Sequence, residues 1–261
     1  MQKTHKLENG HTIIFDSDKH VYIHQDKYVV GMSTLLGKLA SPALENWKLS
    51  NQINAIKKQM ELENIPLDKI DKIIINAKAS AKMQNDNILS VGSIVHKLVE
   101  KWLKGEKIVQ PEDKVIANCF NKFKTFWNKN KLKVVESEKI LYSERGYCGT
   151  LDLIAKDSKG NIWLIDVKTS KGIFLTMLLQ LHGYKLAYEE QTGKKIDKLF
   201  IVRLPKTDED FEARQILYQK DHMKAFLGLL NCHKSELLFN EKVRQLNEIK
   251  KQKKVIKNAI Q

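Results

Sequence analysis

Residues 132–168 constrain the fold of this 261-residue chain more than any other segment. Three apolar runs of strand length follow one another there: 132–143, 147–156 and 161–168. Only short turns, each with a glycine, separate these runs. Turns this short join antiparallel neighbours, because a parallel crossover needs about a dozen residues or more. The segment therefore predicts an antiparallel three-stranded meander.

Helical and strand-like patterns flank the meander on both sides. In chain order they are helices at 93–104, 115–130 and 173–192, strands at 197–204 and 212–218, and a basic helix from about 220 to 258. Gly193 follows the third helix, at the position where glycine commonly ends a helix. The order helix, three strands, helix, strand predicts a mixed α/β fold.

The N-terminal part has a different pattern. Residues 11–30 alternate apolar and polar side chains, which predicts short strands joined by turns, whereas residues 33–103 have helical periodicity. We therefore divide the chain into three parts. These are an N-terminal strand-turn and helical elaboration packed on the core (1–90), the core itself (91–218), and a basic helical C-terminal extension (219–261).

The composition points to a polyanionic partner and a reducing compartment. The formal net charge is +14, and a basic field attracts phosphate backbones. Cys119, Cys148 and Cys232 are odd in number and scattered, so neither a disulfide framework nor a C-x-x-C zinc site is expected. There is no apolar run of about 18 residues and no signal-peptide pattern. We expect a soluble, cytoplasmic protein with no membrane partner.

Charged residues interrupt two of the predicted core strands. Asp166 and Lys168 lie two residues apart on an apolar strand, so both side chains share one face. A D-x-K triplet alone would indicate only an ion pair at a strand end. Here Asp152 also lies between Leu151 and Leu153 on the preceding strand, and the intervening hairpin brings it close to Asp166. Two neighbouring carboxylates repel unless a cation lies between them, which predicts a site for a hard divalent ion.

Four motifs, taken in chain order, resemble the PD-(D/E)XK nuclease superfamily, and specifically its RecB-type branch. They are G-x-x-x-H-x-x-x-E at 92–100, Gly-Thr-Leu-Asp at 149–152, Asp-Val-Lys-Thr-Ser at 166–170, and Q-x-x-x-Y at 180–184. The segment from His20 to Trp47 is similar to the lead-in of phage and mitochondrial genome-maintenance exonucleases. The resemblance covers about residues 20–205 and departs from the superfamily name at Leu151, where a proline would stand. It implies a restriction-endonuclease-like core.

The resemblance also implies roles for individual residues. The metal ligands would be His96, Asp152, Asp166 and the carbonyl of Val167. Lys168 would orient or deprotonate the attacking water and stabilise the developing phosphorane charge.

Three further roles follow from the same motifs. Glu100 would orient His96, and Gln180 and Tyr184 would hold Lys168 and the DNA strand. The cofactor would be Mg²⁺ or Mn²⁺. Three cysteines cannot supply the four ligands of the iron–sulfur cluster found in some members of the branch, so no cluster is expected.

The implied function is metal-dependent hydrolysis of DNA. An exonuclease acting on DNA ends in replication, recombination or repair is the first interpretation. An endonuclease of the same fold and a non-catalytic DNA-binding protein are the alternatives. The expected partner is single-stranded DNA or end-bearing duplex, contacted mainly through its phosphate backbone. Replication or recombination proteins would be further partners.

Some residues near these motifs receive plainer interpretations. Glu138, on the strand before Asp152, has two interpretations: a solvated strand charge, which we favour, or a side chain that faces the same cleft. We interpret His20 and His24 as ordinary strand residues. Gly149 suggests a β-bulge or a close approach of the substrate backbone.

Overall fold

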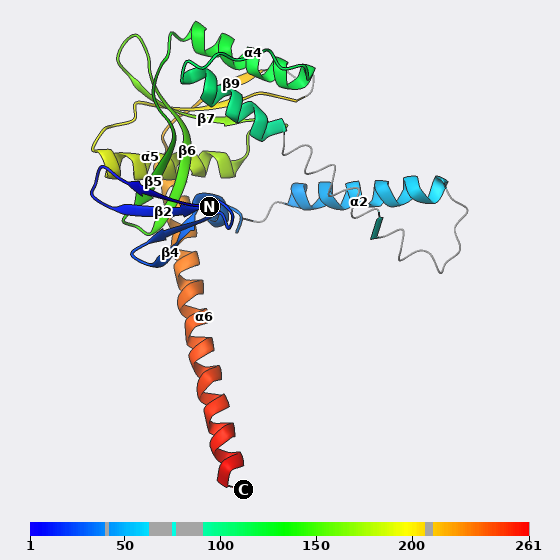
Figure 1. Cartoon of the computed structure of the whole chain (residues 1–261), viewed down its shortest axis with the longest axis vertical. Helices are drawn as coiled ribbons and strands as arrows, with labels where there is room; N and C mark the ends of the chain where they lie inside the picture. Colours follow the sequence, from blue (N-terminus) through cyan, green and yellow to red (C-terminus); the bar gives the residue numbers. More distant parts are fainter. Residues whose placement is uncertain (40–41, 63–74, 77–90, 207–210, 261) are drawn as a thin grey trace.

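The computed structural model describes residues 1–39, 42–62, 75–76, 91–206 and 211–260. The strands are β1 (Gln2–Lys6), β2 (Thr12–Asp16), β3 (Val21–His24), β4 (Lys27–Gly31), β5 (Lys133–Ser143), β6 (Tyr147–Lys156), β7 (Ile162–Lys168), β8 (Lys198–Arg203) and β9 (Glu212–Ile216). The helices are α1 (Met32–Leu36), α2 (Pro42–Leu62), a helix over residues 91–103, α4 (Lys114–Lys129), α5 (Leu175–Thr192) and α6 (Lys220–Ile260). The mixed α/β class is confirmed, and Figure 1 shows the arrangement.

Strand β6 organises the sheet because both of its edges are used. Along one edge β5 pairs with it antiparallel over the whole length of β6. Along the other edge β4 pairs in parallel with Tyr147 and Cys148, and β7 pairs antiparallel with residues 153–156. Two different neighbours thus share this edge, and residues 149–152 lie between them without a strand partner there among the described residues. This gap in the sheet is where Asp152 is found.

The sheet continues from β7 to β8 and β9. Strand β8 is parallel to β7, and α5 makes the crossover between them, as the length of the connection requires. Strand β9 closes this end of the sheet antiparallel to β8. Helix α5 ends at Gly193, whose φ of 68° is the left-handed conformation that glycine adopts most readily.

Helices cover both faces of this part of the sheet. One face is covered by α4 and the helix over 91–103. The aromatic side of α4, with Phe120, Phe123 and Trp127, packs there in one core with Leu153 and Ile165 of the sheet. Helix α4 begins at a favourable cap, because the Asp113 carboxylate accepts the backbone N–H groups of the first turn. On the other face α5 packs between the sheet, α1 and the first turns of α6, and its apolar residues bury in one core with theirs.

The N-terminal strands β1 to β4 form an antiparallel meander that joins the core sheet through β4. Strand β1 was not predicted, because its sequence, QKTHK, lacks apolar residues and it is an exposed edge strand. Ile13 and Tyr22 pack this meander on Ile140 of β5. Of the region predicted to be helical, residues 63–74 and 77–90 lie outside the described residues.

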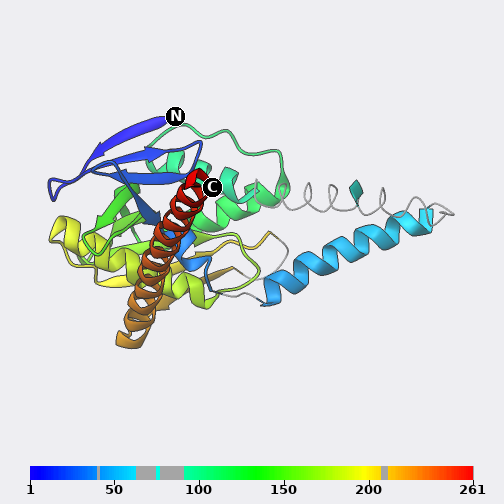
Figure 2. The same ribbon diagram turned by 90° about the horizontal axis from the view of Figure 1, so that it is seen from below.

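Two helices extend away from the sheet. Helix α2 points to one side, and α6 leaves the body as a long single helix after its first turns have packed on α5 (Figures 1 and 2). None of the described helices combines the length and apolar character needed to cross a bilayer.

Candidate metal centre

Asp152 lies at the end of the gap in the edge of β6. Its Oδ2 accepts a hydrogen bond from the backbone N–H of Val167 at 2.7 Å, one strand away. The regular pairing of β6 with β7 stops at Leu153 and Ile165, so this side chain replaces the next bond of the ladder. The side chain is 18% exposed, which leaves part of the carboxylate open to the crevice next to it.

The turn between β6 and β7 is organised by one carboxylate, that of Asp157. Its two oxygens accept hydrogen bonds from the backbone of Lys159 and Asn161 and from the side chains of Asn161, Trp163 and Lys198, at 2.7–3.0 Å. These donors, the Asn161 side chain foremost, hold the pKa of Asp157 below its usual range. The hairpin that brings Asp152 to β7 is therefore stabilised while Asp157 is ionised.

Asp166 and Lys168 form a buried ion pair at the end of β7. Lys168 Nζ lies 2.7 Å from both carboxylate oxygens, with hydrogen-bond geometry only to Oδ1. Asp166 is 1% exposed, and its Oδ2 has no hydrogen-bond partner among the described residues. Burial raises the pKa of Asp166, and repulsion from Asp152 adds to this despite the attraction of Lys168. The Lys168 ammonium group therefore offsets the cost of burying the Asp166 carboxylate.

The same surroundings act on Lys168. Burial by itself would lower the pKa of its ammonium group, but attraction by Asp166 and then Asp152 outweighs this, so the pKa is raised. Lys168 is therefore a cation at neutral pH.

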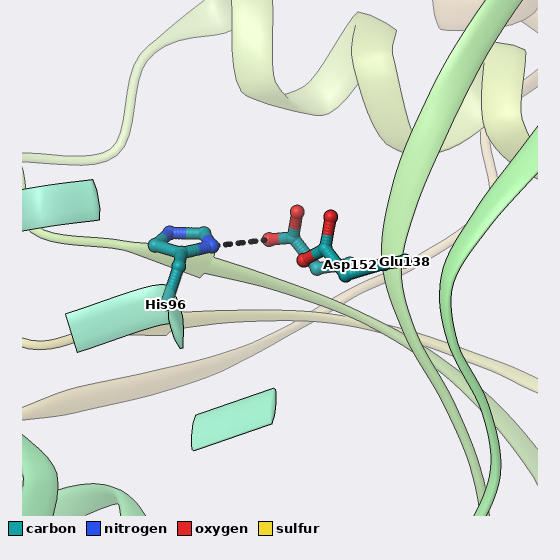
Figure 3. Close-up of side chains that lie close together, drawn as sticks. All are labelled: His96, Glu138 and Asp152. Carbon is teal, nitrogen blue, oxygen red and sulfur yellow. Dashed lines mark ion pairs between the residues drawn. The ribbon is translucent and has the colours of Figure 1, made fainter. Parts of the chain in front are cut away.

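His96 lies on the helix over 91–103, which covers the face of the sheet opposite to α5. That helix approaches β7 closely, since a Cβ added at Gly92 would lie 2.9 Å from Thr169 Oγ1. His96 Nδ1 lies 3.8 Å from Asp152 Oδ2 (Figure 3). This separation is too long for a hydrogen bond, but two ligands of one ion can be this far apart.

Glu138 completes the group and is the residue that sequence reasoning missed. Ligand atoms of His96, Glu138 and Asp152 all lie within 4.8 Å of one another, and the three side chains converge in Figure 3. The sequence pattern favoured a solvated strand charge for Glu138 over a side chain that faces the cleft. Glu138 has a φ of 48°, a conformation rare for a non-glycine residue within a strand.

The two strands are irregular at the same level. On β6 the alternation of faces breaks at Asp152, because Leu151 packs beneath α5 whereas Leu153 packs beneath α4. On β5 the neighbours of Glu138, Ser137 and Lys139, pair regularly with Leu153 and Leu151 across the ladder. The distortion therefore turns two facing carboxylates toward His96.

Partial loss of hydration raises the pKa of Glu138 to about 7, and the charge of Asp152 contributes to the rise. Glu138 as a residue is nevertheless exposed, so solvent weakens both effects. The sequence carried one signal for Glu138: an acidic residue on the strand next to Asp152.

The donor set fits a hard divalent cation. Two carboxylates and one imidazole nitrogen can bind Mg²⁺ or Mn²⁺, with water and substrate oxygens filling the remaining positions. The repulsion between Glu138 and Asp152 favours positive charge at this point. The residues present therefore fit a divalent metal, but the group that converges is His96, Glu138 and Asp152, and Asp166, which was also predicted as a ligand, is not part of it.

Two other residues of the upstream and β7 motifs also line the crevice. Glu100 accepts a hydrogen bond from Lys104 at 2.5 Å, one helical turn further on, and lines the crevice together with His96. Val167 lines it as well, and its N–H is the group bound by Asp152.

Gln180 and Tyr184 lie one turn apart on α5, beneath the gap in β6. Gln180 Nε2 donates to Tyr184 Oη at 3.3 Å, and Tyr184 Oη donates to the carbonyl of Thr150 at 2.9 Å. The Tyr184 ring lies against Gly149, where an added Cβ would be 2.5 Å from Tyr184 Cε1. The close neighbour of Gly149 is therefore the Tyr184 ring. The β-bulge that was the other expectation for Gly149 is not found, because Gly149 pairs regularly with Leu141 of β5.

Solved structures with limited likeness to this chain include two that are described below. No family model matches the chain, and no curated protein matches it in sequence. A crystal structure of a protein from Eubacterium rectale described as a "putative exonuclease" has a TM-score of 0.38 and 15% identity over 57% of this chain. This chain spans 66% of the length of that protein. The structure of SSO0001 has a TM-score of 0.35 and 13% identity, over 80% of this chain and 75% of that one. Likenesses of this size carry no argument about function.

Proposed function

We propose that this protein is a divalent-metal-dependent deoxyribonuclease that hydrolyses phosphodiester bonds at DNA ends. The observation that carries the proposal is the meeting of His96, Glu138 and Asp152 within 4.8 Å, beside a buried Asp166–Lys168 pair. Three ligand groups for a divalent ion, with an ammonium group nearby, can supply the charge stabilisation that hydrolysis of a phosphodiester needs. The RecB-type resemblance of the motifs around these residues supports the same activity.

Each residue has a part in the proposed reaction. His96, Glu138 and Asp152 would hold the ion, and Asp166 and the Val167 carbonyl are further proposed ligands. When bound, the ion supplies charge neutralisation at the phosphate and a more acidic water. Lys168, oriented by Asp166 at 2.7 Å, places its ammonium where negative charge develops on the phosphate oxygens.

The remaining site residues would preorganise this arrangement. Asp152 holds the end of β7 through the Val167 N–H, so the strands that carry the ligands keep their spacing. Tyr184 holds the backbone of the gap at Thr150, and Gln180 positions the Tyr184 hydroxyl. Such supporting contacts matter because small displacements of catalytic groups cost large factors in rate.

The charge of the chain supports DNA as the partner. The excess of +14 would attract a phosphate backbone without regard to sequence, and the exposed lysines of α6 would contribute to it. We propose Mg²⁺ or Mn²⁺ as the cofactor. Action on ends rather than at internal sites follows only from the resemblance to genome-maintenance exonucleases, and replication, recombination or repair would be its setting.

The test is a cleavage assay on end-labelled linear DNA and closed circular DNA, with Mg²⁺ or Mn²⁺ and with EDTA. The wild type should degrade the linear substrates, spare the circle and stop in EDTA. Asp152→Asn should lose activity because it removes an anionic ligand. Asp221→Asn is the matched control. This aspartate at the start of α6 is exposed, and Lys224 is its ion-pair partner among the described residues.

Two results would overturn parts of the proposal. Undiminished cleavage in EDTA, or by Asp152→Asn, would remove the metal centre from the reaction. Rapid cleavage of the closed circle would replace the exonuclease by an endonuclease of the same fold.

A further inference from the structure

A groove of about 410 Å³ opens beside the metal centre, between the N-terminal meander and the core. We call it the N-terminal groove. Glu100 and Glu138 line both this groove and the metal-site crevice, so the two spaces are adjacent. Thr150 and Tyr184, which border the gap in β6, line it from the core side. The groove therefore leads directly to the proposed reaction centre.

Aromatic rings line the opposite wall of the groove. Phe15 of β2 packs against Tyr22 of β3, with ring centroids 4.9 Å apart, and meets His20 edge-on at 5.4 Å. Tyr22 is buried and fixed by a contact of its hydroxyl with Thr150 Oγ1, whereas Phe15 is only partly buried and His20 is exposed. Burial in the core explains Tyr22, but it does not explain rings that stay accessible in a groove.

His20 is held in an unusual conformation. It lies in the turn between β2 and β3 with a φ of 55°, in the left-handed region, which histidine occupies more readily than most residues. This turn places the residue in the wall of the groove, next to Phe15. The sequence pattern had suggested an ordinary strand residue.

The outer edge of the groove is basic. Lys3 and His5, both on β1, line the groove, and neither has an ion-pair partner among the described residues. Lys3 is exposed, whereas His5 is partly buried. The inner end carries the carboxylates Glu100 and Glu138. A phosphate chain would thus find the Lys3 ammonium group on one side and the proposed ligand Glu138 on the side of the metal centre.

We propose that the N-terminal groove binds the unpaired nucleotide next to the scissile phosphate. Its base would lie against Phe15 and His20, and Lys3 and His5 would contact the neighbouring phosphates. This proposal rests on the proposed function and adds a substrate class to it: a single strand whose base is free to stack.

Two features of the groove select this ligand. Its volume lies within the range of roughly 300–1,000 Å³ that holds small-molecule-sized groups, so it accommodates a nucleotide rather than a duplex. An aromatic wall next to a basic edge is the combination used by sites that bind single strands without reading sequence. A duplex keeps its bases stacked on each other and offers no free face to this wall.

The test measures binding separately from cleavage. An Asp152→Asn background prevents turnover, and fluorescence anisotropy compares a labelled single-stranded oligonucleotide with a blunt duplex. His20→Asn removes the ring but keeps a residue that tolerates the left-handed conformation. It should weaken single-strand binding about 5- to 10-fold, at the lower end of the loss expected for one stacked base, and duplex binding less than about 2-fold.

Lys3→Ala should weaken single-strand binding and lower its salt dependence by about one counterion. The matched controls are Tyr28→Ala and Lys27→Ala, because both residues are exposed on β4 of the same meander and neither lines the groove. Both controls should bind within about 2-fold of the parent. Phe15→Ala is a second ring variant, used only if its melting temperature shows that it folds.

The outcomes separate this inference from the proposed function. If the wild type cleaves DNA but His20→Asn and Lys3→Ala bind a single strand like the controls, the groove proposal is wrong and the nuclease proposal stands. Equal weakening of single-strand and duplex binding would also overturn it. If the wild type cleaves no DNA but the ring and lysine variants lose single-strand binding selectively, the groove proposal is supported and the nuclease proposal fails.

Discussion

Replacing Gly149 with alanine tests whether the ring of Tyr184 sets the shape of the gap in β6. The new Cβ would lie 2.5 Å from Tyr184 Cε1 and 3.1 Å from both Tyr184 Oη and Met32 Cβ. The ring has little room to retreat, because Tyr184 is 3% exposed and its hydroxyl is bound to the Thr150 carbonyl. Either the ring moves and loses this hydrogen bond, or the strand moves away from α5.

The expected cost follows from these contacts. Overpacking of a full core costs about 1–3 kcal/mol, and loss of a buried hydrogen bond about 1 kcal/mol. Against this, alanine is favoured over glycine inside a strand by roughly 0.5–1 kcal/mol. The free energy of unfolding should fall by about 1–3 kcal/mol, which lowers the melting temperature by roughly 2–12 °C for a chain of this length.

A double-mutant cycle assigns the effect to the ring. We would measure Gly149→Ala, Tyr184→Ala and the double variant by denaturant unfolding. Tyr184→Ala alone should cost about 3–5 kcal/mol through the cavity that it leaves. In that background Gly149→Ala should cost less than about 1 kcal/mol, since only the contact with Met32 remains. Gly228→Ala on α6 is the control, because a Cβ there meets no atom within 4 Å.

Equal destabilisation by Gly149→Ala in both backgrounds would refute this reasoning. The ring would then not be the neighbour that requires glycine at this position, and the strand backbone itself would be the cause.

Three further predictions concern the site and its support. Lys168→Ala should bind DNA within a few-fold of wild type but cleave roughly 10²–10³-fold more slowly in single-turnover assays. Glu138→Gln should bind Mn²⁺ more weakly in calorimetric titrations, yet its metal-free form should melt no lower than wild type above pH 7, because the repulsion with Asp152 is gone. Asp157→Ala should lower the melting temperature at pH 7, and its difference from wild type should shrink as the pH falls below about 4. The sign follows from the lowered pKa of Asp157, whose stabilising contribution is present above its ordinary pKa and is lost on protonation.

Each of these predictions has a matched control and an outcome that contradicts it. For Lys168→Ala, the control is a joint Lys250→Ala and Lys251→Ala variant on α6, which should weaken DNA binding and leave kcat unchanged. If Lys168→Ala has a normal kcat, Lys168 is an ordinary phosphate contact. Glu112→Gln, exposed and outside the site, should bind Mn²⁺ like wild type. Unaltered Mn²⁺ affinity in Glu138→Gln would exclude Glu138 as a ligand. A difference for Asp157→Ala that stays constant with pH would show that its carboxylate charge does not stabilise the turn.

The sequence by itself determined the mixed α/β class and pointed to charged residues within its strands. Short turns required an antiparallel meander from 132 to 168. Asp152, Asp166 and Lys168 could be chosen because charge inside an apolar strand is costly without a compensating partner. Local periodicity and short-range spacing decide these features, so they can be read without coordinates. The parallel pairing of β8 with β7 was not predicted.

Only the tertiary structure decided which groups meet. Glu138 joined His96 and Asp152 because β5 and β6 are distorted at one level, and alternation predicts no such distortion. His20 entered the groove through a left-handed turn between β2 and β3. The meander that contains this turn joins the core through the parallel pairing of β4 with β6, which no local pattern indicates. The gap at 149–152 exists because β4 and β7 share one edge of β6. Contacts between segments more than a hundred residues apart depend on packing, and a single sequence carries little local signal for them.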